Sequence, residues 1–510
     1  MATLSWCAQI IVLLLPAVAV CVLGSIIVVR RSAARKGLKL PPGPPGLPII
    51  GHLHLMGENP HRTLHKLSQR YGPLFFLRFG SVPVIVASSP QTARLILQTH
   101  DQIFSDRFPT TVDLHLNGSH SILNSHPDPY HTFVRQLCST HLFSSKMVHH
   151  FGPISNQELA HLLSSILANS HTALPFPLRP LLYSTFTNIV SRMILGNKLV
   201  CQFNLLDLVL DWVHMMATFN LSDYIPCCRW LDLQGYAKQS KLLRSKIKTT
   251  FKKAIDQRRQ DHAPGYDQPH DFLNTLLSTS LDNHRANIQI TDDHIISILM
   301  NLFAAGIDTS ALAIEWALME LLANPEKLSI IKAELCNVVG TTRFVQQSDV
   351  SCLPYLEAVI KETFRLHPVA PLLIPHYTIH PCQLLDFEIP SNTMAFVNVW
   401  AIGRDPMLWE NASNFVPERF LGSNMDVHGR QYELLPFGSG RRVCPGLLLG
   451  LNSVQLVLAN LLHCFDWENV GELEFSEKYD IVLQPLKPLT TLAKANLPLH
   501  VIEAQLYEAS

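Results

Sequence analysis

The chain has 510 residues, 47% of them apolar, and its 40 basic side chains are balanced by 40 acidic ones. A nucleic-acid partner is not predicted, because such binding calls for an excess of positive charge. The apolar content is enough for one large buried core, and no internal linker divides the chain. The 11 cysteines contain no C-x-x-C pair, which argues against a zinc ribbon or a thioredoxin-type site.

The first segment is long and apolar enough to cross a membrane. Residues 4–29 contain no charged side chain, and a helix of that length reaches about 39 Å, more than the ~30 Å of a hydrocarbon core. A cleaved signal peptide would need a basic residue before a shorter apolar core. Positive charge holds the following end in the cytosol, and the basic residues there are Arg30, Arg31, Arg35, Lys36 and Lys39. We predict an uncleaved anchor at residues 4–29.

Residues 30–49 are predicted to form a basic and proline-rich hinge. The run from Leu40 to Pro48 reads L-P-P-G-P-P-G-L-P, and proline fixes φ and removes backbone donors. Such a run makes a stiff, extended spacer. A proline-rich ligand for another domain is the alternative, but the position directly after an apolar segment favours the spacer. Residues 50–510 are then expected to form one domain.

Helical periodicity dominates that domain. Helices are predicted at Thr92–Gln98, Leu205–Ala217, Leu242–Arg259, Asp292–Ala323 and Leu353–Leu366. Short strands are predicted at Leu74–Val86 and Thr393–Val399. The polar segment Gln260–His270 contains Pro264-Gly265 and is predicted as a mobile surface loop. The fold class is therefore mainly α with a small β component.

The long apolar segment Asp292–Ala323 carries an unusual polar motif, A-G-I-D-T-S, at residues 305–310. A glycine inside a helix costs about 1 kcal/mol relative to alanine, and a threonine can bond back to a helix carbonyl and distort the helix. Gly306 and Thr309 together predict a small groove, beside which Asp308 and Thr309 offer a carboxylate and a hydroxyl. Alone, the motif is better explained as a helix with an incidental polar pair.

Glu362 and Arg365 are three residues apart on a predicted helix, so their side chains share a face. An E-x-x-R pair by itself is weak evidence of a special role, because surface ion pairs have the same spacing. A second arginine, Arg419, follows in the segment F-V-P-E-R-F at residues 415–420.

The strongest local motif is F-G-S-G-R-R-V-C-P-G at residues 437–446, directly before the apolar segment Leu447–Leu462. Glycines let backbone N–H groups approach a large ligand or an anionic sulfur. A thiolate just before a helix gains from the N-terminal dipole and the free N–H donors, so Cys444 is a candidate ligand. A glycine-rich turn around a buried cysteine is the plain alternative, but the full pattern F-x-x-G-x-R-x-C-x-G is far more specific.

This pattern resembles the haem-binding loop of the cytochrome P-450 superfamily. The A-G-x-D-T, E-x-x-R and P-E-R-F segments occur in the family's order, and the resemblance covers essentially the whole chain. Matches to the plant microsomal A-type branch include residues 51–54, 400–406 and 463–467. The resemblance implies the cytochrome P-450 fold, a single large haem domain at 50–510 behind an N-terminal anchor helix.

The resemblance also implies roles for individual residues. Cys444 would be the axial thiolate and metal ligand of haem b, a ligation that favours O–O cleavage, and Asp308 and Thr309 would manage proton delivery. Glu362, Arg365 and Arg419 would form a buried structural triad. The remaining cofactor-binding residues would be Arg442, Arg135, His131, His376, Phe437, Gly438, Gly440 and Gly446. His131 stands where the family often has tryptophan, and it can donate a hydrogen bond to a haem carboxylate.

The implied reaction is oxidation of a lipophilic small molecule of plant specialised metabolism, such as a flavonoid, phenylpropanoid, terpenoid or alkaloid. O2 supplies the oxygen, and electrons come from NADPH through a separate NADPH–cytochrome P-450 reductase at the endoplasmic reticulum membrane, with the catalytic domain cytosolic. The chain has no G-x-G-x-x-G fingerprint after a strand, so it is not expected to bind the dinucleotide itself. The expected substrate pocket is apolar and includes Ala304, Ala305, Leu373, Ile374 and Leu486.

Two other functions remain open at this point. A haem-thiolate isomerase or dehydratase would work without O2, and the Asp308-Thr309 pair argues against it because such enzymes do not need that pair. A non-catalytic haem-binding membrane protein would hold the cofactor without turning over a substrate.

Overall fold

The computed structural model describes residues 38–118, 120–196, 205–261, 271–281 and 288–509. The predicted anchor at 4–29, the first part of the hinge and most of the predicted loop Gln260–His270 lie outside the described residues. Two described helices, Asp292–Ala323 and Leu447–Cys464, are long and apolar enough to cross a membrane, but their most apolar windows are 78% and 67% buried. They are therefore core helices of the folded domain.

Helices make up most of the structure, and each segment predicted to be helical overlaps one or more of them. The α-helices are α2 (Pro60–Tyr71), α3 (Pro90–Arg94), α4 (Thr111–Asn117), α5 (Pro129–Cys138), α6 (Ser145–His150), α7 (Gly152–Thr172), α8 (Arg179–Leu195), α10 (Leu205–Ala217), α11 (Leu221–Tyr224), α12 (Tyr236–Asp261), α13 (Phe272–Leu281), α14 (Asp292–Ala323), α15 (Pro325–Val339), α16 (Pro354–Leu366), α17 (Val399–Ile402), α18 (Leu447–Cys464) and α19 (Leu499–Ala509).

Short helical turns link several of these elements. The 3-10 turns are η1 (Leu53–Leu55), η4 (Pro226–Leu231), η5 (Val350–Cys352), η6 (Pro417–Phe420) and η7 (Gly440–Arg442), and the π-helical turns are η2 (Leu95–Thr99) and η3 (Ser139–Phe143). The predicted helix Thr92–Gln98 is thus divided between α3 and η2.

The strands form small sheets at the edges of the helical body. The largest has the order β1 (Leu74–Phe79), β2 (Val82–Ala87), β7 (Met394–Val397) and β4 (His376–Tyr377), with β2 and β7 parallel. The others pair β5 (Cys382–Leu384) with β6 (Phe387–Ile389), β9 (Glu477–Asp480) with β10 (Val482–Pro485), and β11 (Thr490–Ala495) with both β3 (Phe176–Pro177) and β8 (Phe465–Asn469). The predicted strand Leu74–Val86 is a hairpin, which turns at Gly80 and Ser81.

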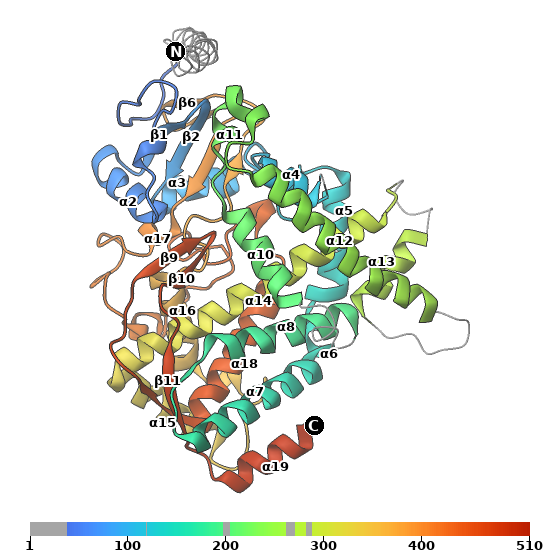
Figure 1. The fold of residues 1–510 in the computed structure, drawn as a ribbon. Coiled ribbons are helices and arrows are strands. Elements are labelled where there is room, and N and C mark those ends of the chain that lie inside the picture. The colour runs from blue at the N-terminus through green and yellow to red at the C-terminus, as the bar shows by residue number, and fades with distance from the viewer. Residues whose placement is uncertain (1–37, 119, 197–204, 262–270, 282–287, 510) are drawn as a thin grey trace, which may run out of the picture.

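The buried sheet lies between two apolar clusters. Alternate side chains of a strand point to opposite faces, so Ile85 and Ala87 of β2 join one cluster, while Val84 and Val86 join another. Figure 1 shows this sheet at the end of the molecule nearer the N-terminus, with the helices filling the rest. The sheet positions His376, which lies on β4.

Helix α14 is the central element of the helical core. It runs through the middle of the molecule (Figure 1) and packs against α8, α12, α16 and α18. Most of its side chains are buried, as its continuous apolar sequence predicts. Helix α18, which directly follows the cysteine loop, is one of the helices that pack against α14.

Candidate functional site

The cysteine loop, residues 437–446, folds back on itself just before α18. The Cys444 amide donates to the Phe437 carbonyl at 3.0 Å, and Gly446 is the N-cap residue of α18. The Cys444 side chain is exposed, yet protein surrounds the thiol closely enough for burial to raise its pKa. A Gly446 backbone hydrogen bond and the Arg135 guanidinium both act to lower the pKa of this thiol.

Two glycines of the loop have left-handed backbone conformations, Gly438 and Gly440, each with φ of 71°. A Cβ atom at Gly440 would lie 1.9 Å from the Leu97 carbonyl oxygen of η2, so any other residue would push the loop and η2 apart. A Cβ atom at Gly438 would lie 3.6 Å from the Leu373 side chain, which is an ordinary contact. The requirement for glycine at 440 therefore comes first from packing against another backbone segment.

Aromatic and arginine contacts hold the two ends of the loop. The Phe437 ring meets Phe364 of α16 with 5.6 Å between ring centroids. Arg135 of α5 donates from Nη2 to the carbonyl of Val443 at 2.9 Å. The residue before Cys444 is thus tied to a helix more than 300 positions earlier in the chain.

Arg442 is the most heavily bonded residue of the loop. Its Nε donates to the Ser105 carbonyl at 2.7 Å and its Nη2 to the Ser125 carbonyl at 2.5 Å. Its Nη1 lies 2.8 Å from Nε2 of His131. Because a guanidinium only donates, Nε2 of His131 is the acceptor and carries no proton.

Burial and the neighbouring Arg442 and Arg135 lower the pKa of His131 to about 4, so the ring is neutral. In this arrangement Nε2 of His131 orients the guanidinium of Arg442. The hydrogen bond from His131 to a haem carboxylate stays a prediction.

The structure adds Arg107, which the sequence motifs did not single out. It is buried, and its Nη1 donates to the carbonyls of Ile374 and Pro375 at 2.7 and 2.9 Å. The next residue, His376, is also buried and has Nδ1 2.8 Å from the Phe104 carbonyl. That carbonyl accepts, so Nδ1 carries the proton. No local sequence signal marks Arg107, because its importance comes from neighbours more than 250 residues away.

These side chains form a cationic cluster of Arg107, Arg135 and Arg442 beside the cysteine loop. Burial and Arg442 lower the pKa of Arg107, and burial and Arg135 lower that of Arg442 to about 10. Asp106 and Asp128 offset part of the charge. Three guanidinium groups against two carboxylates leave a positive excess, which favours a ligand that brings carboxylate groups of its own.

The A-G-I-D-T-S motif of α14 interrupts an otherwise buried helix. Ala304 is buried, whereas Ala305 is exposed and Thr309 is half-buried. The Thr309 Oγ1 donates to the Ala305 carbonyl at 2.7 Å, which is the back-bond that its position suggests. Small accessible residues in the middle of a core helix mark a face left open for a ligand.

Gly306 allows α8 and α14 to pack closely, because a Cβ atom there would lie 2.9 Å from Cγ2 of Val190 on α8. The neighbouring Ala305 and Thr309 form the open face described above, and the groove predicted from Gly306 and Thr309 stays a prediction.

Asp308 is buried with 4% of its surface exposed, and its Oδ1 accepts a hydrogen bond from the Tyr183 hydroxyl at 2.5 Å. Burial raises the pKa of this carboxyl, while Tyr183 and Arg179 act to lower it. Asp308 and Thr309 are thus adjacent in sequence, but the carboxylate faces α8 and the threonine lies at the open face.

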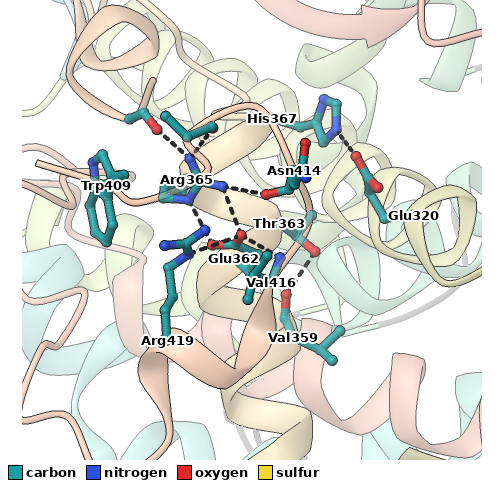
Figure 2. Close-up of polar contacts among 12 residues, drawn as sticks. Glu320, Val359, Glu362, Thr363, Arg365, His367, Trp409, Asn414, Val416 and Arg419 are labelled. Carbon is teal, nitrogen blue, oxygen red and sulfur yellow. Dashed lines mark hydrogen bonds and ion pairs between the residues drawn. The ribbon is translucent and has the colours of Figure 1, made fainter. Parts of the chain in front are cut away.

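Glu362, Arg365 and Arg419 come together as a buried ionic triad (Figure 2). Arg365 donates to both carboxylate oxygens of Glu362 at 2.7 Å, and Arg419 Nε lies 3.2 Å from Oε1. The Val416 amide also donates to Oε1 at 2.7 Å. Arg365 further donates to the carbonyls of Gly403, Ala412 and Asn414. The triad therefore joins α16 to the segment that leads to the cysteine loop.

The residues predicted to line a substrate pocket differ in their exposure. Leu373 and Ile374 are half-buried directly before His376, and Leu373 has a left-handed φ of 50°. Leu486 is 52% exposed in the turn between β10 and β11. Accessibility and a position near Thr309 or His376 in the chain thus occur together at Ala305, Leu373 and Ile374. Leu486 is accessible but is not close in the chain to either residue.

Comparison with known proteins places this geometry in context. The family model described as Cytochrome P450 matches residues 41–492. Cytochrome P450 76C2 of Arabidopsis thaliana is 39% identical over 477 residues, which cover 90% of this chain and 93% of that protein. The flavonoid 3',5'-hydroxylase of Campanula medium is 36% identical over 90% of this chain and 92% of its own length. The drimenol monooxygenase of Persicaria hydropiper is 36% identical over 93% of this chain and 95% of its own length.

Solved structures show the same fold. A zebrafish cytochrome P450 in a structure with abiraterone superposes with a TM-score of 0.72 at 27% sequence identity, covering 86% of this chain and 100% of that one.

Proposed function

The chain belongs to the cytochrome P450 family, and from this premise we propose that it oxidises a lipophilic plant metabolite at a haem held by Cys444. The enzyme is a cytochrome P450 monooxygenase of plant specialised metabolism, and its prosthetic group is haem b. The observation that carries the assignment of the site is Cys444, which is accessible just before α18 and lies beside a partly buried cationic cluster.

The residues of the site suit this cofactor. Arg107, Arg135 and Arg442 offer the positive charge that the two haem propionates need, with His376 next to them. When bound, the haem supplies thiolate-ligated iron and the one-electron and oxygen chemistry that the protein lacks. The protein's own part is to orient the cofactor, hold the substrate against the face of α14 at Ala305, and place Thr309 and Asp308 where protons are needed.

The relatives suggest the kind of substrate. Similar proteins carry names that specify flavonoid hydroxylation and drimenol oxidation, and the expected pocket residues of this chain are apolar. We therefore propose a lipophilic substrate of the flavonoid, phenylpropanoid, terpenoid or alkaloid classes. A binding screen against such metabolites tests this: a ligand that displaces water from the iron shifts the haem spin state. A full panel without any shift, on protein that holds haem, would contradict the proposed substrate class.

Electrons are proposed to come from NADPH through a membrane-bound reductase. Arg441 is 61% exposed in its side chain and is partly neutralised by Asp101, 3.2 Å away, so a basic residue is present at the surface next to the cysteine loop. A haem-thiolate isomerase would neither consume NADPH nor require O2. NADPH consumption and product formation in the presence of the reductase distinguish the two reactions.

The location is proposed to be the endoplasmic reticulum membrane, with one anchor at residues 4–29 and a cytosolic catalytic domain. Deletion of residues 2–30 is expected to release the protein from microsomes, because a ~30 Å apolar span is lost. Sedimentation of the truncated protein together with the membrane fraction would show that another part of the chain holds the membrane.

Replacing Thr309 with alanine is expected to uncouple NADPH consumption from product formation. The change removes a hydroxyl at the open face of α14 and its bond to the Ala305 carbonyl, so a proton-transfer contact is lost while the helix remains. Product formed per NADPH consumed is the measurement. Thr249→Ala on α12 is the matched control, because Thr249 makes the same back-bond, to Ser245, on an exposed surface. Equal coupling in both variants would remove the role proposed for Thr309.

A further inference from the structure

Helices α8 and α14 share a polar seam made of two facing pairs. On α8, Arg179 and Tyr183 are four residues apart and lie on one face. On α14, Asp308 and Glu315 are seven residues apart and also share a face. The Arg179 Nε donates to Glu315 at 2.6 Å, and the Tyr183 hydroxyl donates to Asp308 at 2.5 Å.

The two pairs differ in how firmly they are held. Arg179 also donates to the Gln484 side chain at 3.1 Å and to the Pro485 carbonyl at 3.0 Å. Glu315 also accepts from the Leu489 amide at 2.8 Å. This ion pair is therefore locked by the segment around β10. The Tyr183–Asp308 pair is a hydrogen bond between a hydroxyl and a carboxylate. Burial and Asp308 raise the pKa of Tyr183, so the phenol keeps its proton and the carboxyl group is the one that can titrate.

The second pair lies beside the open face of α14. Asp308 is buried and Tyr183 is half-buried, whereas Ala305 is exposed and Thr309 is half-buried at the open face. Tyr183 therefore holds the carboxylate of the motif from the side of α8, and the next residue along α14 lies at the face on which the proposed chemistry takes place.

We propose that Tyr183 is a positioning residue that holds the Asp308 carboxylate in place and stabilises its ionised form. The hydroxyl donates a hydrogen bond and keeps its own proton, so Asp308 alone gains and releases the proton. The inference rests on the proposed oxygen chemistry at the face of Thr309.

The charges around Asp308 suit a proton that is held and then released. Burial raises the pKa of the Asp308 carboxyl, Tyr183 and Arg179 lower it, and Asp480 raises it. Glu315, farther along α14, is partly neutralised by Arg179. Loss of the Tyr183 hydroxyl removes a donor to the ionised carboxylate, so the pKa of Asp308 should rise further.

Infrared spectroscopy of the haem-loaded protein tests this step without relying on activity. The carbonyl stretch of protonated Asp308 is identified as the band lost in Asp308→Asn. In Tyr183→Phe this band is expected to persist to higher pH than in the wild type, because the ionised form has lost its hydrogen bond. The same titration in both proteins would overturn the proposal. A band that disappears at lower pH in Tyr183→Phe would overturn it as well.

Turnover in H2O and D2O provides the second measurement. Tyr183→Phe is expected to show several-fold less product per NADPH consumed and a larger solvent isotope effect, since proton supply becomes slower. Tyr355→Phe is the matched control. The Tyr355 hydroxyl also donates to a carboxylate, that of Glu418 at 2.8 Å, but this pair is not part of the seam. The control variant should therefore behave as the wild type. If Tyr183→Phe equals the control in both quantities, Tyr183 serves packing alone.

The failure of this inference is separable from failure of the proposed function. A wild type that forms product with NADPH, while Tyr183→Phe is unchanged, contradicts only the role of Tyr183. A wild type that holds haem but forms no product from any ligand that shifts its spin state contradicts the proposed function itself. If Tyr183→Phe does not fold, Asp308→Asn keeps an acceptor for the Tyr183 hydroxyl. Loss of coupling in that variant is expected, and full coupling would show that the carboxylate held by Tyr183 has no part in the reaction.

Discussion

Cys444→Ala is expected to abolish the thiolate-type absorption of the reduced carbon monoxide complex and all monooxygenase activity. Alanine removes the sulfur while leaving the backbone that the loop depends on, including the bond from the residue 444 amide to the Phe437 carbonyl. Iron bound without a thiolate loses the electron donation that favours O–O cleavage. The protein should therefore still fold, and any haem that it retains should have the spectrum of a different ligation.

Another exposed cysteine offers a clear control for this prediction. Cys336 on α15 is exposed and distant in sequence from every motif of the site, so Cys336→Ala should keep the wild-type spectrum. Cys444→Ser tests the same point with an oxygen in place of sulfur and should likewise lose the thiolate signature. A thiolate-type spectrum in either Cys444 variant would show that another residue holds the iron.

The second large effect is expected on stability, from Arg365→Ala. Arg365 and Glu362 are both buried with side chains 0% exposed, and the substitution removes both Arg365 bonds to that carboxylate. Breaking one partner of a buried ion pair costs about 3–5 kcal/mol, and three carbonyls, of Gly403, Ala412 and Asn414, also lose a donor. We expect a fall of that size in the free energy of unfolding, measured by denaturant titration, together with loss of bound haem.

An exposed pair provides the comparison. Arg259 donates to both carboxylate oxygens of Asp292 with 44% of the Arg259 side chain exposed, so Arg259→Ala should cost less than about 1 kcal/mol. Arg365→Lys should remain strongly destabilised, because an ammonium has three donors and cannot reproduce the planar fork of a guanidinium. Equal stability of Arg365→Ala and Arg259→Ala would show that the triad in Figure 2 contributes no more than a surface pair.

The effect of Arg365 should reach the cysteine loop through the backbone. The three carbonyls that it holds belong to the segment 403–414, and Val416 donates to Glu362. This segment leads to the loop at 437–446. If the Arg365→Ala variant keeps most of its helical content but binds haem weakly, that result would indicate that the effect reaches the loop through this segment.

What the sequence determines about this protein is what depends on spacing along the chain. The pattern around Cys444 spans ten residues, and Glu362 and Arg365 lie within a stretch of four residues. Helices α10 and α14 have the predicted bounds, because a continuous apolar periodicity over many residues leaves little alternative to a buried helix. Helix α12 starts earlier than predicted, at Tyr236, because Asp232 accepts from the amides of Ala237 and Lys238 and so begins the helix before its apolar periodicity does.

The tertiary structure decides the contacts between residues that are far apart in the chain. Arg107 joins the cationic cluster, Gly306 fits against Val190, Gly440 against Leu97, and Asp308 meets Tyr183 across 125 positions. His131 accepts from Arg442, which depends on where α5 and the cysteine loop lie together. Such partners are set by packing of whole helices in three dimensions, and a local motif carries no information about which side chain will face it. The sequence therefore identifies the chemistry of this enzyme, and the fold determines which residues surround and orient the candidate site.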